Sequence, residues 1–173
     1  MLEIERKFLI DGFLEDICSK DEYSKWGIDL LDEIELEQGY VSIQPEIRIH
    51  SAKNIHTGEM DFRLTLKGDG KLTRTEIKTD VDENFFKETV SFLGVPMIQK
   101  EYKSYRFGQW ILEVCRVDAN TENDFFYAEI EFETEEEANA FEVPKFFGTE
   151  VTEDDDYKMK NYWKRTRECG MME

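Results

Sequence analysis

The sequence has few cysteines, few prolines and no long apolar run. Its 173 residues include three cysteines and three prolines. Cys18, Cys115 and Cys169 are odd in number and lack the CxxC spacing of zinc or redox sites, which favours a reducing compartment. No apolar run approaches membrane-spanning length, and charged residues interrupt the first ten positions, unlike a secretory signal. We therefore expect a cytoplasmic protein without a membrane partner.

Positive charge is also scarce. The 22 Lys and Arg residues face 40 Asp and Glu residues, for a formal net charge of -18. Such a charge repels nucleic-acid backbones and anionic lipids, so we expect no nucleic-acid partner. It also suits a protein that gathers divalent cations, but an acidic surface is more often a solubility feature, and we favour that interpretation for the charge as a whole.

Hydrophobic residues make up 40% of the chain, which is enough for one sizeable core. No linker rich in Gly, Pro or Ser interrupts the sequence, and no repeat of solenoid period is present. We therefore expect a single domain over residues 1–173.

Alternation of apolar and polar residues predicts strands along most of the chain. The predicted strands are 2–10, 33–43, 45–51, 60–68, 72–80, 97–107, 110–118 and 126–133. Helices are predicted at 13–26, 83–93, 135–142 and 153–167. The last two follow capping boxes from Thr134 to Glu137 and from Thr152 to Asp155. The predicted fold is α+β: an eight-stranded antiparallel β-barrel with peripheral helices and a C-terminal helix.

The polar faces of these strands carry patterned charge. Basic and mixed sets alternate with apolar residues at Arg48 and His50, at Arg63, Thr65 and Lys67, and at Arg74, Glu76 and Lys78. An acidic set follows at Glu129, Glu131 and Glu133. If the apolar faces pack under the helices, the charged faces either meet water or line a lumen. An eight-stranded barrel leaves a narrow lumen for a small ligand, across which the basic and acidic strands would meet.

Pairs of carboxylates two residues apart on a strand point the same way and suit a hard divalent cation. Glu3 and Glu5 form one such pair, and Glu129 and Glu131 form another. The tripeptide Glu-Ile-Glu occurs three times, at 3–5, 33–35 and 129–131, so it is weak evidence alone. For Glu33, Glu35 and Glu37 we favour a solvated strand face, because no basic residue continues it.

The first copy belongs to an ExExK strand, Glu3-Ile4-Glu5-Arg6-Lys7. Further motifs follow in order: Gln38-Gly39-Tyr40-Val41, Glu46-Ile47-Arg48-Ile49-His50, Leu64-Thr65-Leu66-Lys67, Arg74-Thr75-Glu76, Ala128-Glu129-Ile130-Glu131-Phe132, and the segment from Phe147 to Asp154. This series resembles the CYTH superfamily, or triphosphate tunnel metalloenzymes, which includes inorganic triphosphatases, thiamine triphosphatases and class IV adenylate cyclases. The resemblance spans nearly the whole chain.

The resemblance implies an eight-stranded tunnel in which basic residues hold a triphosphate and acidic residues bind Mg²⁺ or Mn²⁺. The implied metal ligands are Glu3, Glu5, Glu76, Glu113, Glu129 and Glu131. The implied triphosphate contacts are Lys7, Arg48, His50, Arg63, Lys67, Arg74, Lys100 and Arg106. Glu5, Lys7 and Glu113 are the implied catalytic residues. Metal and fixed cations would neutralise phosphoryl charge, and no covalent intermediate is required.

The chain departs from the family pattern at three places. His50 stands where many members have arginine, and we expect it to be a weaker, pH-dependent phosphate contact. In the segment 100–106 the family arginine has no unambiguous equivalent. If Glu113 faces inward and Gly108-Gln109 is a two-residue hairpin loop, register directs Lys100, Tyr102, Ser104 and Arg106 inward. Asp156 also replaces a common arginine, a change for which Lys158 or Arg63 would compensate.

Three functions remain open from the sequence. The first is a metal-dependent triphosphatase acting on tripolyphosphate, with ATP and thiamine triphosphate as further small-molecule substrates. The second is a class IV adenylate cyclase, in which a His-Phe pair tends to precede ExExK, whereas Met1 and Leu2 stand here. The third is a polyphosphate- or nucleotide-binding module without catalysis, favoured by His50 and Asp156. A homodimer is an expectation from the resemblance alone.

Overall fold

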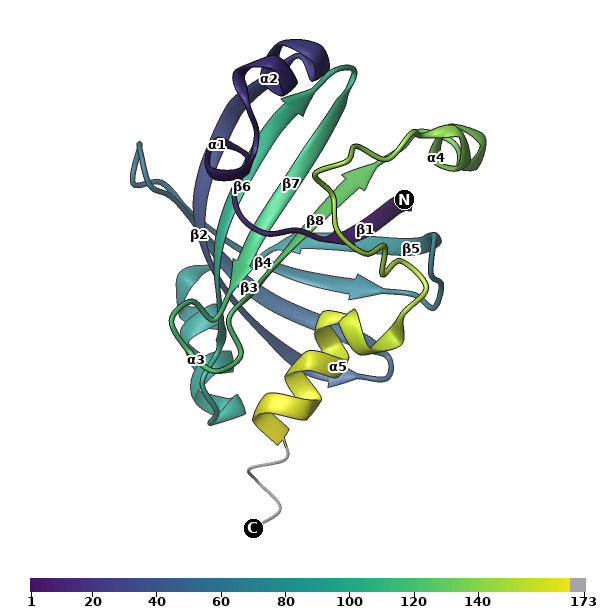
Figure 1. The fold of residues 1–173 in the computed structure, drawn as a ribbon. Coiled ribbons are helices and arrows are strands. Elements are labelled where there is room, and N and C mark those ends of the chain that lie inside the picture. Colours follow the sequence, from purple (N-terminus) through teal and green to yellow (C-terminus); the bar gives the residue numbers. More distant parts are fainter. Residues whose placement is uncertain (169–173) are drawn as a thin grey trace.

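Eight antiparallel strands close into a barrel in the computed structural model, which describes residues 1–168 (Figure 1). The strands follow the order β1-β5-β4-β3-β2-β6-β7-β8 around the barrel. Their bounds are β1 Leu2–Leu9, β2 Ile28–Ile43, β3 Glu46–Asn54, β4 Met60–Lys67, β5 Thr73–Asp80, β6 Ile98–Phe107, β7 Trp110–Val117 and β8 Phe125–Glu131. The predicted fold class is therefore confirmed.

Strand β2 begins five residues before the predicted start, at Ile28 instead of residue 33. The extra residues pair with the end of β6, where Ile28 lies opposite Phe107, and a bulge falls between Leu30 and Asp32. The bulge explains the error, because it breaks the period-two alternation from which strands are predicted. The extra residues of β2 extend its pairing with β6 beyond the part of the barrel that β8 closes.

Helix prediction was accurate for two segments that begin with a side-chain cap. Helix α3 (Glu83–Leu93) begins after Asp82, whose carboxylate accepts from the Phe85 amide, and ends at Gly94 with a φ of 68°. Helix α4 (Glu135–Ala140) begins after Thr134, which accepts from the Glu137 amide as predicted. The single helix predicted at 13–26 was wrong. It divides into α1 (Leu14–Ile17) and α2 (Lys20–Trp26), because Ser19 and Glu22 form a capping box that starts a new helix.

The predicted helix at 153–167 starts later than expected and is divided. A 3₁₀ turn η1 (Asp155–Tyr157), helix α5 (Met159–Trp163) and a π-helical turn η2 (Lys164–Glu168) occupy the segment. Thr152 does not cap a helix, because its hydroxyl accepts from the Lys7 amide at 2.9 Å and donates to Glu150. The segment before α5 is thereby fixed to β1.

Helix α5 packs against β2 near one end of the barrel (Figure 1). Gly39 permits this close approach, because a Cβ atom there would lie 2.7 Å from the Met97 sulfur and 3.2 Å from Trp163. Met97, Met159, Tyr162 and Trp163 belong to a buried cluster at this position. The glycine of the Gln-Gly-Tyr motif is thus explained by packing. Among residues 1–168 no helix combines the length and apolar character needed to cross a membrane.

The last turn of the described chain is anchored through Asp118, which is 7% exposed. Arg167 donates to both carboxylate oxygens of Asp118, at 2.6 and 2.9 Å, and the Tyr162 hydroxyl also donates to it. Burial opposes ionisation, but these hydrogen bonds outweigh it and lower the pKa of Asp118 below its ordinary 3.8. The carboxylate therefore stabilises the docked helix whenever it is charged.

We expect Asp118→Asn to lower the free energy of unfolding by about 3 kcal/mol, because it leaves a half-buried guanidinium without its counter-charge. In the Asp118→Asn variant the fluorescence emission of Trp163, which is 2% exposed in the wild type, should shift to the red. The emission is measured in a background in which Trp26 and Trp110 are replaced by Phe, so that only Trp163 contributes. Because the folded-state pKa lies below the unfolded one, the wild-type advantage should be complete above about pH 4 and decline at lower pH. Asp124→Asn weakens a more exposed pair, with Arg116, and should cost much less. Equal losses in the two variants would contradict the stabilising role of Asp118.

Candidate active site

The inward faces of the strands line a cavity of about 500 Å³. It contains every sequence-predicted site residue except one: Glu3, Glu5, Lys7, Arg48, His50, Arg63, Lys67, Arg74, Glu76, Lys100, Glu113, Glu129 and Glu131. Apolar residues that alternate with them, such as Phe8, Leu112 and Ile130, are fully buried in a separate cluster. The charged faces therefore line a lumen, which decides between the two arrangements left open by the sequence.

Arg106 is the exception, and its predicted place in the lumen was wrong. It lies on the same face of β6 as Lys100 and Tyr102, but it pairs with Asp29 at an exposed position outside the cavity. Strand β8 pairs with β7 only as far as Leu112, whereas the β6–β7 hairpin continues to Phe107 and Trp110. Arg106 thus lies past the end of the closed barrel.

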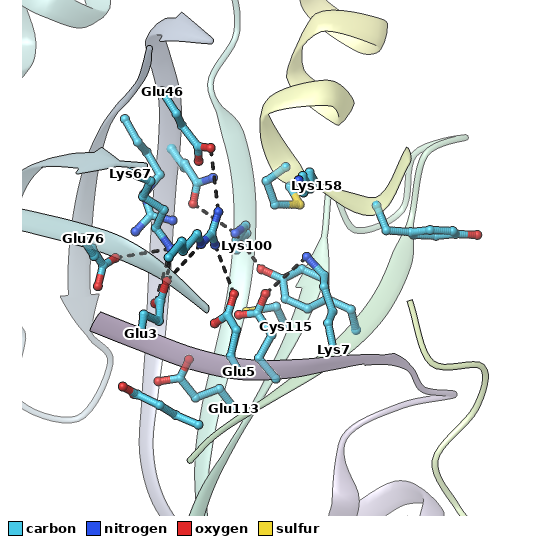
Figure 2. A pocket seen from close by; sticks show the side chains of 18 of the residues that line it. Glu3, Glu5, Lys7, Glu46, Lys67, Glu76, Lys100, Glu113, Cys115 and Lys158 are labelled. Carbon is cyan, nitrogen blue, oxygen red and sulfur yellow. Dashed lines mark hydrogen bonds and ion pairs between the residues drawn. The ribbon is translucent and has the colours of Figure 1, made fainter. Parts of the chain in front are cut away.

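The side chains of Glu3, Glu5 and Lys7 project from β1 into the cavity (Figure 2). Arg74 donates to Glu3 and to Glu5, at 3.1 and 3.0 Å. The Lys7 ammonium lies 3.2 Å from Glu129 on the neighbouring strand β8. The ExExK strand is therefore held by ion pairs to both of its neighbours.

Lys67 links β1 to the next acidic residue around the barrel. Its ammonium lies 3.1 Å from Glu3 and 3.3 Å from Glu76, and Glu76 also pairs with Lys78 at 2.8 Å. Burial opposes ionisation of Glu76, but the two lysines outweigh it and lower the pKa of that carboxyl group. Anionic and cationic side chains alternate around this part of the lumen.

The carboxylates across the lumen repel one another. Burial and the charge of Glu129 raise the pKa of Glu5. Burial and Glu129 likewise raise the pKa of Glu113, whose Oε1 accepts from the Tyr102 hydroxyl at 2.8 Å. Glu129 itself stays ionised, because Lys7 and Lys100 outweigh its burial and lower its pKa. Such crowding of carboxylates is typical of functional sites.

No three acidic, histidine or cysteine side chains among residues 1–168 already converge to share one cation. The carboxylates instead pair mainly with Lys and Arg. The donor set nevertheless fits a hard divalent cation in its chemistry, because carboxylate oxygens are the preferred ligands. Burial and Glu3 also raise the pKa of Glu131, so a cation would relieve repulsion at several positions.

Arg48 is a cavity cation with a buried, unpaired donor. Its Nε atom is buried and has no hydrogen-bond partner among the described residues. Thr65, opposite Arg48 on β4, likewise has a buried hydroxyl without a partner. Buried donors are nearly always satisfied in proteins by protein, water or ligand. Arg48 lines the cavity and therefore has hydrogen-bonding capacity to offer a molecule bound in the lumen, whereas Thr65 is not among the residues that line it.

His50 lines the cavity, but the predicted pH dependence of this contact was wrong. Burial and the charges of Arg48 and Arg63 lower the pKa of His50 to about 3. The imidazole is therefore neutral near physiological pH and can contact a phosphate only as a neutral group. The sequence could not show this, because the surrounding cations come from other strands.

We expect His50 to show no titration between pH 5 and 8. Its ring resonances, assigned by comparison with His50→Gln, should not move in an NMR titration over this range. The pH–activity profile of His50→Gln should keep the shape of the wild-type profile, whatever its height. A wild-type inflection near pH 6.5 that His50→Gln removes would contradict the neutral assignment.

Several lining residues were not selected as site residues from the sequence: Gln38, Tyr40, Glu46, Lys71, Lys78 and Tyr127. Strand parity would have found some of them, because Glu46 shares a face with Arg48, and Lys78 shares one with Arg74. Lys158, named as a replacement for the missing arginine, does line the cavity, whereas Asp156 is exposed. Glu33, Glu35 and Glu37 lie outside this cavity, although Glu33 pairs with Lys103 and His56.

Solved structures share this barrel. A crystal structure of an inorganic triphosphatase, NE1496, matches with a TM-score of 0.57 and 26% identity over 92% of this chain and 93% of that one. HpAC1 from Hippeastrum, described as an adenylyl cyclase with a dominant triphosphatase activity, shares the fold at 12% identity, with a TM-score of 0.51 over 79% of this chain and 82% of that one. The barrel is therefore similar to that of an inorganic triphosphatase, and the charged lumen and the ordered motifs agree with the resemblance to the CYTH superfamily, the triphosphate tunnel metalloenzymes.

The sequence is similar over nearly its whole length to one curated protein in particular. It is 29% identical over 163 residues to the inorganic triphosphatase of Nitrosomonas europaea, covering 92% of this chain and 95% of that protein. No family model matches the sequence.

Proposed function

We propose that this protein is a divalent-metal-dependent triphosphatase whose substrate is inorganic tripolyphosphate. The observation that carries the proposal is Arg48, which lines the charged cavity and whose buried Nε donor has no partner among residues 1–168. A guanidinium with an unsatisfied donor suits an oxyanion that completes its hydrogen bonds. The similarity to the Nitrosomonas europaea inorganic triphosphatase supports the same substrate class.

The basic residues would bind and orient the triphosphate. Lys7, Arg48, His50, Arg63, Lys67, Arg74 and Lys100 approach the lumen from β1, β3, β4, β5 and β6. Binding from several strands aligns the chain of phosphoryl groups and places the charge that develops during reaction among fixed cations. Phosphoryl transfer depends mainly on such positioning and charge stabilisation, and needs no covalent enzyme intermediate.

The acidic residues would hold the cation, which we propose to be Mg²⁺ or Mn²⁺, through Glu3, Glu5, Glu76, Glu113, Glu129 and Glu131. When bound, the ion supplies Lewis-acid chemistry to the phosphoryl oxygens. The raised pKa of Glu113, caused by burial and Glu129, suits this residue to accept a proton from the attacking water. Attack of water on a terminal phosphorus and breakage of its bridging P–O bond would release orthophosphate and pyrophosphate.

The cellular setting is also a proposal. We infer a cytoplasmic location from the unpaired cysteines, since Cys18 and Cys115 are free thiols and Cys169 lies outside the described residues. The acidic charge supports the inference that nucleic acid is not a partner. We retain one domain over residues 1–173 and a homodimer as proposals from the sequence and the family.

The test is an assay of the purified protein with tripolyphosphate, ATP and thiamine triphosphate. Each reaction is run with Mg²⁺, with Mn²⁺ and with EDTA, and is analysed for orthophosphate, pyrophosphate and cyclic AMP. We expect orthophosphate and pyrophosphate from tripolyphosphate, loss with EDTA, and recovery when either ion is added back. Cyclic AMP from ATP would support a cyclase instead, and tight binding without any product would support a non-catalytic module.

A further inference from the structure

Tyr127, on β8, contacts two ammonium groups of the cavity at once. The Lys7 Nζ atom lies 4.0 Å from the centroid of the Tyr127 ring, within the range of a cation–π interaction. The Lys100 Nζ atom donates to the Tyr127 hydroxyl oxygen at 2.7 Å. One side chain therefore engages two cations by two different chemistries, through its ring and through its hydroxyl.

The surroundings of Tyr127 are closed and hydrogen-bonded. Tyr127 is 2% exposed and Lys100 is 6% exposed. Lys100 also donates to Gln38 at 3.0 Å, and the Gln38 amide donates to the Tyr40 hydroxyl at 2.9 Å. Lys100 is thus fixed from two sides, by Tyr127 and by Gln38.

Two ammonium groups close to one ring repel each other. Burial, with Arg48 and Lys7 adding to it, lowers the pKa of Lys100 to about 8. Of these two lysines, only Lys7 has a carboxylate within ion-pair distance among the described residues, and that carboxylate belongs to Glu129. The arrangement therefore carries positive charge that a bound polyanion would neutralise.

We propose that Tyr127 is a positioning residue, which holds Lys7 and Lys100 together as a two-ammonium clamp for one end of the triphosphate. This inference rests on the proposed function, since the clamp is defined by what the cavity binds. Tyr127 lines the cavity, but it acts through the two lysines. Preorganised cations bind an anion without first paying an ordering cost in side-chain entropy.

Substitutions at Tyr127 separate its two contacts. Tyr127→Phe keeps the ring beneath Lys7 and removes only the acceptor for Lys100. We expect it to raise KM for tripolyphosphate about tenfold, with kcat changed less than about twofold, as for loss of ground-state binding. Tyr127→Leu removes both contacts and should raise KM by about a further tenfold.

Tyr105→Phe is the matched control. This substitution likewise removes a hydroxyl group from a fully buried ring. In the wild type the Tyr105 hydroxyl accepts from the Leu14 amide and donates to Glu15 at 2.6 Å. It lies outside the cavity, so KM and kcat should stay at wild-type values. Melting temperatures of both Phe variants show whether a change in KM at Tyr127 follows general destabilisation.

A double-mutant cycle with Lys100→Met distinguishes positioning from packing. If the hydroxyl acts through Lys100, Tyr127→Phe should have no further effect on KM in the Lys100→Met background. An equal increase in KM in both backgrounds, or no increase in either, would overturn the proposal.

Binding and hydrolysis measured on the wild-type protein distinguish a failure of the proposed function from a failure of the role proposed for Tyr127. If the wild type binds tripolyphosphate but does not hydrolyse it, the hydrolase proposal fails, and the same cycle is then measured as dissociation constants by calorimetry. If the wild type neither binds nor hydrolyses tripolyphosphate, both proposals fail. If the wild type is active and the cycle is additive, only the positioning role of Tyr127 fails.

Discussion

Arg74→Met is expected to cause the largest combined loss of stability and activity. Arg74 lies near three carboxylates, with Glu3 at 3.1 Å, Glu5 at 3.0 Å and Glu46 at 3.8 Å. Burial opposes its charge, but these carboxylates outweigh burial and raise the pKa of the guanidinium group. Removing the cation leaves the buried Glu5 without its ion-pair partner and weakens the compensation of Glu3 and Glu46, so we expect the free energy of unfolding to fall by about 3–5 kcal/mol.

The same substitution should lower kcat/KM for tripolyphosphate more than about hundredfold, because one of the fixed cations of the lumen is lost. Arg74→Lys separates the two effects. It keeps the charge but not the fork that reaches Glu3 and Glu5 together, so stability should recover more than kcat/KM. Chemical denaturation and initial-rate kinetics provide the two measurements.

Arg63→Met is the stability control for Arg74. Arg63 also lines the cavity, but its partner Asp80 is 80% exposed at the side chain, and their contact is 3.0 Å. An exposed pair contributes less than about 1 kcal/mol, so Arg63→Met should unfold almost like the wild type. Equal destabilisation by Arg63→Met and Arg74→Met would show that the ion pairs around Arg74 do not stabilise the barrel.

Glu5→Gln is expected to abolish metal-dependent hydrolysis without destabilising the protein. The amide can still accept from Arg74, whose Nη2 lies 3.0 Å from Glu5 in the wild type. A neutral amide is a much poorer ligand for Mg²⁺ or Mn²⁺ than a carboxylate, so we expect at least about a hundredfold loss of kcat. The assay is release of orthophosphate from tripolyphosphate at saturating Mg²⁺ or Mn²⁺.

Glu5→Gln should not lower the stability of the protein, although it lowers the activity. Burial and the charges of Glu129 and Glu3 raise the folded-state pKa of Glu5 above its ordinary 4.5. A raised carboxyl pKa means that the wild type loses stability as pH rises through the folded-state value. Without a metal ion, Glu5→Gln should therefore match or exceed the wild type in unfolding free energy at pH 8, and have no such advantage at pH 4.

Glu35→Gln is the matched control for Glu5, because it belongs to another Glu-Ile-Glu tripeptide, at 33–35. Glu35 is exposed and lies outside the active-site cavity. Its substitution should leave both turnover and stability unchanged. Full activity of Glu5→Gln, or a comparable loss in Glu35→Gln, would remove the metal-ligand role proposed for the first tripeptide.

The sequence predicted which face of each strand a side chain occupies, but not how far along the barrel it lies. Period-two alternation correctly directed Glu5, Lys67, Arg74 and Glu129 toward one lumen, since successive side chains of a strand point to opposite faces. Alternation gives the face of a strand but not the position along the barrel axis. Arg106 was misplaced for this reason: its face was correct, but β8 ends before reaching its level.

Electrostatic environment was less predictable than strand direction. His50 was expected to titrate, yet burial and cations from other strands lower its pKa to about 3. Tyr127 was not selected at all, because its two contacts involve Lys7 on β1 and Lys100 on β6. Neither lysine is near Tyr127 in the sequence, so no local pattern indicated the contact.

The sequence by itself determined the strands, their inward faces and the order of motifs along the chain. These features depend on the pleat and on short-range spacing, which a single strand already possesses. Only the tertiary structure decided which charges pair, which remain unsatisfied and where the lumen ends. Lys67 meets Glu3 across 64 residues of sequence, and such contacts exist only after the barrel closes. Closure also buries these groups, and burial is what changes their ionisation.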